Sequence, residues 1–335
     1  MSNSQAAQLP TVTIIIAARP EEAEPDSLRA ARKLDYPHDL LEILVARGRQ
    51  PSVQRNHAAR VAKGELIYFL DDDSVPGPDC LRLAVKEFAD PKVAMVGGPN
   101  LCPADAPPLE QAFALVMGAP LAFWSSSARY RRVGEVRATS EKELILCNML
   151  VRRQTFLDLG GFDEALYPNE ENALMDTLQK RGSKLIYHPQ IVVYRRPRRT
   201  LPAFVRMLRN YGRGRAEQFR LHPTPGSILN FAPPLFLIYL LLAPWLPKLF
   251  LVPLSFYGAA VLIQTVMLAR EGWGRLGGSL ALPGVVARVP ALLFMSHIFY
   301  GVGIWQGLFT RLGPQPGRPA PEVKLERILI GSAPP

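Results

Sequence analysis

Residues that form cross-links and metal centres are scarce in this chain. Its 335 residues include three cysteines and five histidines. Cys80, Cys102 and Cys147 form no C-x-x-C pair, and the histidines do not show the spacing of zinc ligands. The sequence therefore predicts free thiols in a reducing compartment, and it argues against a disulfide-rich fold and against a zinc site.

A signal-peptide pattern is also missing from the start of the chain. No basic residue precedes the first apolar run, Val12–Ala18, and Arg19 ends that run at strand length. We therefore expect a β-strand here and no signal peptide. Charged residues make up 20% of the sequence and apolar residues 48%, which excludes a disordered protein.

What the chain does contain divides it into two unlike parts. The net charge is +10 and the mean hydropathy is +0.06, but nearly all acidic residues lie before residue 225. Three uncharged runs follow, at Ile228–Pro247, Leu249–Ala269 and Val289–Thr310. Each has about the 20 apolar residues that a helical membrane span needs. We expect membrane insertion, and buried core helices are the alternative.

The charges beside the apolar runs predict the orientation in the membrane. Five arginines precede the first run: Arg206, Arg209, Arg213, Arg215 and Arg220. The positive-inside rule therefore predicts that the large N-terminal part is cytoplasmic. With the apolar runs as membrane spans, the expected location is the inner (cytoplasmic) membrane, with more than one pass. A third crossing would carry the basic C-terminal residues to the other side. The last run is alternatively re-entrant or interfacial, with Gly301, Gly303 and Gly307 as break points, so two and three crossings both stay open.

Short apolar strands alternate with helices in the first hundred residues. The pattern predicts strands at 12–18, 41–46, 66–70 and 93–97, and helices at 26–33, 53–63 and 80–88. This alternation favours an α/β domain with a mainly parallel central sheet. In such sheets, ligands bind at the carboxyl ends of the strands.

Three consecutive carboxylates, Asp71, Asp72 and Asp73, follow the strand at 66–70. Adjacent carboxylates repel one another, and Mg²⁺ or Mn²⁺ would relieve that repulsion and also bind a diphosphate. The alternative is a solvated acidic turn that caps the next helix at Asp79. The position at the end of a strand favours the metal site.

A second polar cluster begins at the glycine pair Gly160-Gly161 and leads to Asn169-Glu170-Glu171 at the start of a helix. The paired glycines permit a tight turn, and the dipole at a helix N-terminus favours ionised carboxylates. A carboxylate in a cleft can act as a general base. From the local sequence alone, helix capping by Asn169 is the simpler interpretation.

In this order, the motifs resemble those of the family 2 glycosyltransferases, which bind nucleotide sugars with a GT-A fold. The likeness covers about residues 10 to 220. Its segments are the D-x-D motif at 69–73, then 148–153 with 160–164, 169–171, and the Tyr-Gly-Arg-Gly segment at 209–215. The segment 296–303 also resembles a C-terminal segment of membrane-attached members in exopolysaccharide-type pathways.

The resemblance implies roles for individual residues. Asp71 and Asp73 would hold Mg²⁺ or Mn²⁺ against the donor diphosphate, with Asp73 the more direct ligand. Glu171 would take the proton from the acceptor hydroxyl, and a single displacement would invert the anomeric centre. The donor-binding residues would be Glu21 (or Glu22), Arg55, Asp71 and Asp72, and the acceptor-side residues Asn148, Glu170 and Arg213.

The chain departs from the family pattern at Glu171, where the family usually has Asp, and in two segments. Residues 45–52 are rich in arginine where the family commonly has an Asp-containing segment that contacts base and ribose, so uridine is not implied. Arg47, Arg49 and the nearby Arg55 would grip phosphates or form a solvated basic loop. The Gln-x-x-Arg-Trp motif of processive synthases is absent, since Phe219-Arg220-Leu221 follow Gln218. One sugar per acceptor is therefore favoured over polymerisation.

The arginine-rich stretch 194–199 leads into a segment with apolar residues at helical spacing, 201–219. It predicts an amphipathic helix that lies on anionic lipid headgroups, and nucleic-acid binding is the less favoured interpretation. The expected organisation is a GT-A catalytic domain at 1–200, an interfacial helix and linker at 201–226, a transmembrane region at 227–311 and a polar, proline-rich tail at 312–335.

These features together predict an integral-membrane, metal-dependent, inverting glycosyltransferase of the hexosyltransferase type. It would move one sugar from a nucleotide-sugar donor to a lipid-linked acceptor such as a polyprenyl-phosphate carrier, in envelope or exopolysaccharide synthesis. The alternatives are a non-catalytic membrane scaffold that binds nucleotide sugar or lipid, and a nucleotidyltransferase. No motif names the sugar, the nucleotide or the acceptor.

Overall fold

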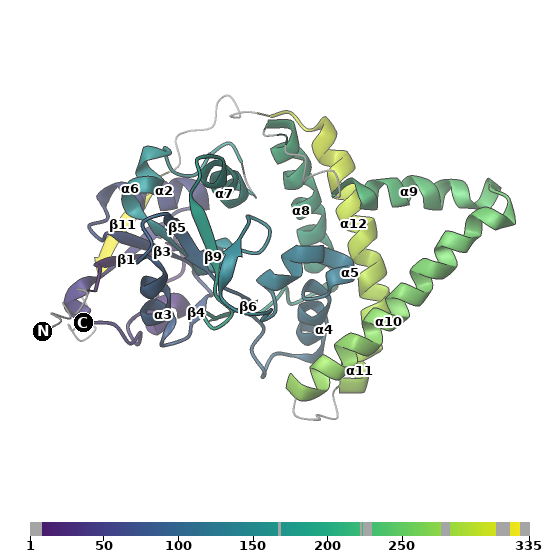
Figure 1. Cartoon of the computed structure of the whole chain (residues 1–335), viewed down its shortest axis with the longest axis horizontal. Coiled ribbons are helices and arrows are strands. Elements are labelled where there is room, and N and C mark those ends of the chain that lie inside the picture. The colour runs from purple at the N-terminus through teal and green to yellow at the C-terminus, as the bar shows by residue number, and fades with distance from the viewer. Residues whose placement is uncertain are drawn as a thin grey trace, which may run out of the picture.

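The computed structural model describes residues 9–166, 169–221, 223, 230–275, 282–312 and 322–328. The predictions for Ile228, at the start of the first apolar run, and for most of the tail at 312–335 lie outside these residues. Figure 1 shows an α/β domain at one end of the molecule and a group of helices at the other.

An eight-stranded sheet forms the centre of the α/β domain, in the order β11-β2-β1-β3-β8-β5-β9-β7. Its strands are β1 (Val12–Ala18), β2 (Leu41–Arg47), β3 (Leu66–Asp71), β5 (Val93–Gly97), β7 (Arg137–Thr139), β8 (Met149–Arg152), β9 (Lys184–Tyr187) and β11 (Lys324–Ile328). β2, β1, β3, β5 and β9 point the same way, and β8, β7 and β11 run against them. The predicted α/β class with a mainly parallel sheet is confirmed.

A smaller sheet joins β4 (Val75–Pro76), β10 (Val193–Tyr194) and β6 (Asn100–Leu101). β10 lies between the other two strands, antiparallel to β4 and parallel to β6. Because β4 follows β3 by a few residues, this small sheet holds the chain after β10 close to the end of β3.

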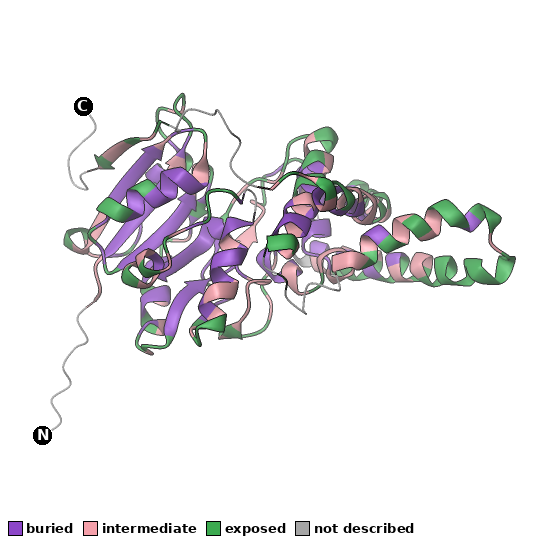
Figure 2. Cartoon of the chain, turned by 90° about the horizontal axis from the view of Figure 1, so that it is seen from above, coloured by how far each residue is buried: buried purple, intermediate pink, exposed green. Residues whose placement is uncertain are grey.

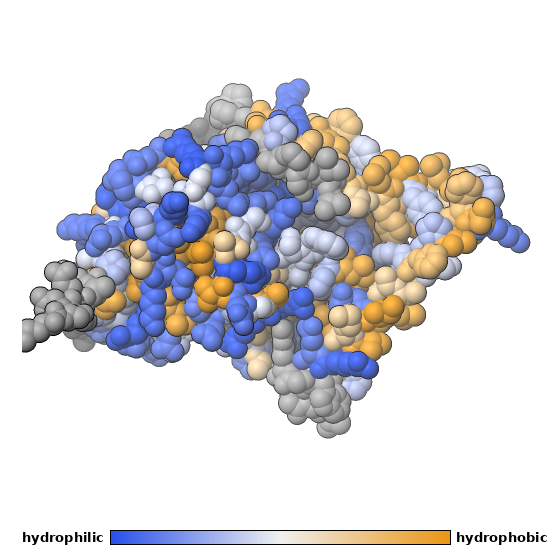
Figure 3. Space-filling model, viewed as in Figure 1, coloured by the Kyte–Doolittle hydropathy of each residue, from blue (hydrophilic) through white to orange (hydrophobic). Residues whose placement is uncertain are grey.

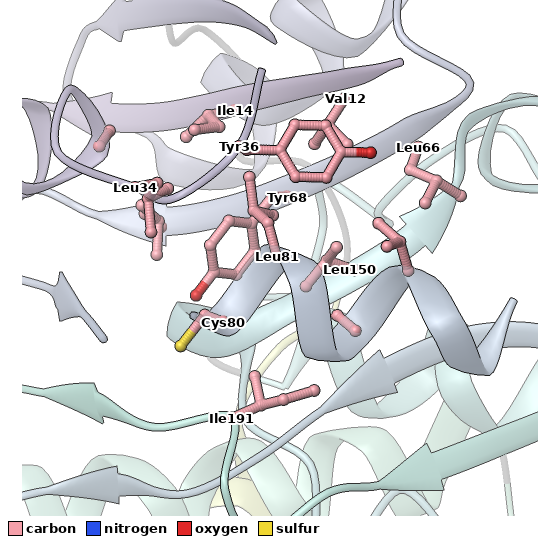
Figure 4. Close-up of a cluster of buried hydrophobic side chains, with 14 of the residues drawn as sticks. Val12, Ile14, Leu34, Tyr36, Leu66, Tyr68, Cys80, Leu81, Leu150 and Ile191 are labelled. Atoms are coloured by element: carbon pink, nitrogen blue, oxygen red, sulfur yellow. The ribbon is translucent and has the colours of Figure 1, made fainter. Parts of the chain in front are cut away.

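Helices cover both faces of the large sheet because alternate strand residues point to opposite sides. Ile14 and Ile16 of β1 belong to one apolar cluster, with α1 (Asp26–Ala31) and α3 (Cys80–Glu87). Figure 4 shows this cluster around Tyr68 and Leu81. Ile15 belongs to the opposite cluster, with α2 (Pro51–Val61), α6 (Arg153–Asp158) and α7 (Glu170–Lys180). The strands and helices predicted in the first hundred residues are confirmed, with small shifts at their ends.

α8 (Leu201–Leu221) connects the α/β domain to a group of mostly apolar helices. These are α4 (Pro108–Met117), α5 (Pro120–Phe123), α9 (Ala232–Leu242), α10 (Val252–Arg275), α11 (Leu282–Val286) and α12 (Val289–Phe309). The helix predicted at 201–219 is present as α8, but its Phe204, Met207 and Leu208 are buried in a cluster with α4 and α12. Phe113 of α4 stacks on Phe204 with ring centroids 4.2 Å apart. The apolar face that the sequence assigned to lipid therefore packs against protein.

Glycines allow α8 and α12 to touch. A Cβ atom on Gly212 would lie 2.1 Å from the carbonyl oxygen of Tyr300, and one on Gly303 would lie 2.1 Å from that of Arg209. α12 continues as one helix through Gly301, Gly303 and Gly307. The expected break points are wrong, because these glycines serve close packing between helices.

α9 and α10 extend from the rest of the molecule as a hairpin (Figures 1 and 2). Leu241 is 71% exposed and Phe256 is 73% exposed, and this end of the molecule has a largely apolar surface (Figure 3). Two helical segments, Lys248–Gly272 and Pro283–Phe309, are long and apolar enough to cross a membrane, and Ala232–Trp245 is a shorter apolar helix. The described part of the first predicted run thus forms the shortest of the three apolar helices.

The end of the described chain returns to the large sheet. β11 pairs with β2 in antiparallel register, from Lys324 opposite Arg47 to Ile328 opposite Ile43. Arg47 Nε lies 3.0 Å from Glu326 Oε1. The segment predicted as part of a polar tail therefore forms an edge strand.

Candidate functional site

The carboxyl end of β3 carries the acidic turn that the sequence singled out. Asp71 is the last residue of β3, and Arg195 follows β10 directly. Arg195 Nη1 lies 2.8 Å from Asp71 Oδ2, and its Nε lies 2.5 Å from Asp73 Oδ1. One guanidinium thus joins two of the three carboxylates.

A second arginine approaches the same turn from α2. Arg55 Nη2 lies 2.5 Å from Asp71 Oδ1, and its Nη1 lies 3.4 Å from Glu170 Oε1 at the start of α7. The side chain of Arg55 is 4% exposed and that of Glu170 is 2% exposed. Arg55, Asp71 and Asp73, predicted as donor-side and metal residues, therefore come together, and Arg55 links them to α7.

Burial and charge act in opposite directions on these carboxyl groups. Burial alone would raise the pKa of Asp71, but Arg195 and Arg55 outweigh it and hold that pKa below its usual value. Burial raises the pKa of Asp73 despite Arg195, and the adjacent aspartates add to the rise. Burial, followed by a hydrogen bond with Asp72, raises the pKa of Glu22 to about 7. The positive charge of the arginines therefore outweighs burial at Asp71 but not at Asp73 or Glu22.

The acidic turn suits a divalent ion that is shared with the phosphates of a ligand. The Asp73 side chain is 47% exposed, and its ion pair with Arg195 uses one of its two oxygens. Within the described part of the chain, no group of three or more His, Cys, Asp and Glu side chains could hold a metal by itself. Mg²⁺ commonly takes one or two carboxylates and completes its shell with water and substrate phosphates. Asp73, with Asp71 beside it, fits that pattern.

The glycine pair before α7 forms the predicted tight turn, since Gly160 and Gly161 both have a φ of 82°. A Cβ atom on Gly161 would lie 2.5 Å from Asn56 Oδ1. The Phe162 backbone N–H donates to that oxygen at 2.9 Å, and Asn56 Nδ2 donates to the Phe162 carbonyl at 2.9 Å. The turn is thereby tied to α2, the helix that carries Arg55.

Glu170 and Glu171 begin α7 but lie in different surroundings. Glu170 is buried against Arg55, and burial, with Glu171 as the second cause, raises its pKa to about 8. Glu171 is partly exposed and lines a cavity. Asn169 precedes the helix with a φ of 100° and makes no capping hydrogen bond through its side chain. The structure therefore does not bear out the capping interpretation of Asn169.

The cavity beside Glu171 has a volume of about 480 Å³. Segments far apart in the sequence form its wall: α5 and the 3-10 helix Trp124–Arg129, α8, α9, α10 and α12. Its polar and charged side chains include Arg129, Lys142, Asn169, Arg215 and His297, and its aromatic ones are Phe123, Trp124, Tyr130, Tyr211, Phe236, Tyr257 and Tyr300. The cavity thus connects an ionisable carboxylate to the apolar helices.

The predicted acceptor-side residues do not line this cavity. Asn148 is fully buried, and its Oδ1 accepts a hydrogen bond from the Tyr68 hydroxyl at 2.9 Å. Glu170 faces Arg55, and Arg213 forms an ion pair within α8. Asn148 thus supports the core, and Glu170 is connected to the acidic turn through Arg55.

The structure also separates the two glutamates after β1. Glu21 pairs with Arg49 on an exposed loop, whereas Glu22 interacts with Asp72 of the acidic turn. The sequence placed Arg195 only within a basic stretch, and it gave no sign of Arg129 or Trp124 in the cavity. The sole signal for Arg195 was its position directly after a short apolar run, 191–194.

The chain is similar to known proteins in sequence and in fold. Residues 66–269 match the model of the glycosyl transferase family group 2. The chain is 28% identical to the succinoglycan biosynthesis protein ExoA of Rhizobium meliloti (strain 1021) over 164 residues. These aligned residues cover 48% of this chain and 46% of that protein. The chain thus matches about half the length of this relative.

Among solved structures, the chain is similar to the mannosyltransferase PcManGT from Pyrobaculum calidifontis in complex with GDP-Man and Mn²⁺. The TM-score is 0.55 at 19% identity, over 84% of this chain and 87% of that chain. This likeness supports the GT-A fold. The family match covers more than half of the chain and includes the acidic turn, the start of α7 and α8. The chain therefore belongs to the family 2 glycosyltransferases.

Proposed function

We propose that this glycosyltransferase moves one sugar from a nucleotide-sugar donor to a lipid-linked acceptor, with inversion at the anomeric carbon. The observation that carries the proposal is the cavity that joins Glu171 to α9, α10 and α12. A water-soluble acceptor would not need a route walled by helices with exposed apolar faces. The relative ExoA is named for succinoglycan biosynthesis, which supports a role in envelope or exopolysaccharide synthesis.

The acidic turn is the proposed donor site. Arg55 and Arg195 adjoin Asp71, and guanidinium groups bind diphosphates with paired hydrogen bonds. Asp73 and Asp71 would hold Mg²⁺ or Mn²⁺, which when bound offsets the negative charge of the leaving diphosphate. The complex of PcManGT with GDP-Man and Mn²⁺ supports this choice of ligands. Arg195 would exchange its carboxylate partners for phosphate oxygens when the donor binds.

Glu171 is the proposed general base. Glu171 lies in the first turn of α7 and lines the cavity, whereas Glu170 keeps its proton near pH 7 because its pKa is raised to about 8. The acceptor hydroxyl oxygen forms a bond to the anomeric carbon as the bond from that carbon to the diphosphate breaks. The hydroxyl proton goes to the Glu171 carboxylate. Because there is one displacement, the configuration inverts.

The cavity is the proposed acceptor site. Arg215 lines it and suits the phosphate of a polyprenyl-phosphate carrier. Trp124 and Tyr211 offer aromatic faces to a sugar, and the lipid tail would leave along Phe236 of α9 and Tyr257 of α10. The α/β domain would then lie on the cytoplasmic side of the inner membrane, as the arginines of α8 predict.

The test uses membranes that contain the protein and a panel of labelled nucleotide sugars. We expect label from one donor to appear in the extracted lipid when Mg²⁺ or Mn²⁺ is present. Asp73→Ala should abolish it, and Glu135→Gln should retain it, because Glu135 is exposed and contributes no side chain to the site. Calorimetry that finds donor binding without transfer to any lipid would favour the scaffold instead.

A further inference from the structure

The described end of the chain lies in the same sheet as its beginning. β11 pairs with β2, which pairs with β1. Ile328 packs against the apolar cluster on one face of the sheet and Leu325 against the cluster on the other. Any membrane segment between α8 and β11 must therefore leave from and return to the side that holds the α/β domain. The number of crossings is even.

α12 is long and apolar enough to cross a membrane, but it lies alongside α8 and packs closely against it (Figure 1). Cβ atoms on Gly303 and Gly307 would lie 2.1 and 2.3 Å from the carbonyl oxygens of Arg209 and Arg213. Arg220 Nη1 donates to the Gly307 carbonyl at 2.9 Å. Arginine is among the costliest side chains in the bilayer centre. α12 cannot enter the hydrocarbon without taking the arginines of α8 with it.

α9 and α10 remain as the segment that leaves the protein. The Tyr239 hydroxyl donates to the Phe250 carbonyl at 2.8 Å near their turn, where Trp245 is 80% exposed. At the opposite end of α10, Glu271 pairs with Arg131 at 3.1 Å. Figure 2 shows that exposed residues cover most of the hairpin and that its base meets the other helices. One end of the hairpin is thus anchored in protein and the other is free.

We propose that α9 and α10 enter the bilayer as one hairpin from the side of the α/β domain, while α8 and α12 lie at the headgroups of that leaflet. The occupant of the exposed faces is lipid hydrocarbon, because Lys248 at the turn is the only charged residue from Ala232 to Ala269. The Lys248 stem can extend its ammonium group toward water. Exposed Arg270 and Arg288, beside the base of the hairpin, suit anionic headgroups. This inference rests on the membrane attachment in the proposed function.

The experiment places single cysteines at exposed positions in the full chain. Glu135→Cys marks the α/β domain, Trp245→Cys the hairpin turn, Arg288→Cys the start of α12, and Lys324→Cys the strand β11. A membrane-impermeant maleimide is added to inside-out and right-side-out vesicles. Labelling is measured as the increase over the parent chain, and labelling in detergent checks that each thiol is reactive.

We expect Glu135→Cys, Arg288→Cys and Lys324→Cys to be labelled in the same vesicle orientation and to lose labelling in the other. Trp245→Cys should be protected in the orientation that labels Glu135→Cys. Labelling of Arg288→Cys or Lys324→Cys in the opposite orientation would overturn the hairpin, and so would labelling of Trp245→Cys together with Glu135→Cys. Release of the parent protein by an alkaline wash would instead remove the membrane attachment on which the inference rests.

Discussion

Arg195→Gln removes the cation that links the two proposed metal ligands. Arg195 lies 2.8 Å from Asp71 Oδ2 and 2.5 Å from Asp73 Oδ1. A hydrogen bond to a charged group contributes about 1.5–3 kcal/mol, and the partial exposure of Asp73 favours the lower end of that range. Mn²⁺ that binds before the donor must displace Arg195 from Asp73. Because about 1.4 kcal/mol corresponds to tenfold in affinity, we expect Mn²⁺ to bind the donor-free variant ~10-fold more tightly.

In the assay, the purified protein is titrated with Mn²⁺ in the absence of any donor. Electron paramagnetic resonance measures how much Mn²⁺ is bound at each step. Arg196→Gln is the matched control, because Arg196 pairs with the exposed Asp105 at 3.2 Å and does not touch the acidic turn. The nucleotide sugar should bind Arg195→Gln more weakly than the parent. An unchanged Mn²⁺ affinity in Arg195→Gln, or an equal change in both variants, would refute the competition between Arg195 and the metal.

Helix packing, protonation and acceptor recognition each give one further prediction. Gly303→Leu should lower the free energy of unfolding by about 1–3 kcal/mol, because its Cβ would meet the Arg209 carbonyl, and the Tm in detergent should fall. Gly258→Leu, whose Cβ would have nothing within 4 Å, should not lower the Tm, because loss of a glycine inside α10 favours the helix. The folded state raises the pKa of Glu170 from 4.5 to about 8, so its contribution to stability is present below pH 4.5 and is lost as pH rises toward 8. Glu170→Gln should flatten this decline, and a Tm that falls between pH 5 and 8 as steeply as in the parent would contradict the assignment. Trp124→Ala should raise the KM for the lipid acceptor roughly 2- to 10-fold, from an aromatic contact of about 0.5–1.5 kcal/mol, and an equal rise in the donor KM would speak against this role.

The central strands could be predicted because each is a continuous apolar run buried on both faces. Ile14, Ile15 and Ile16 are all fully buried, since helices cover both sides of β1. β8 and β9 have four residues each, too few for a period to stand out. β11 reads Lys-Leu-Glu-Arg-Ile, without the alternation of a half-buried strand, so its pairing with β2 at the edge of the sheet follows from tertiary contacts.

The place of the acidic turn could be predicted because it directly follows an apolar strand. Glu171 was singled out only by the resemblance to the family, since the local sequence at the start of α7 favoured helix capping. Arg195 could not be assigned to the turn, since the small sheet around β10 brings it there from over a hundred residues away. The cavity residues come from segments that span 120–300, and no local pattern connects them. From the sequence, Gly303 was expected to break the apolar run. Its close contact with α8 could not be recognised, because it depends on how the two helices pack.

Transfer of a labelled sugar to lipid by Glu171→Gln is the most direct test of the proposed function. Purified protein in lipid nanodiscs is supplied with the nucleotide sugar identified by the panel and with extracted lipid acceptor, and donor binding is measured by calorimetry on the same sample. We predict a loss of about 10²–10⁴-fold in the transfer rate, as expected for removal of a general base, with donor affinity unchanged. Transfer at the parent rate by folded Glu171→Gln would contradict the role of Glu171 at the end of the lipid cavity.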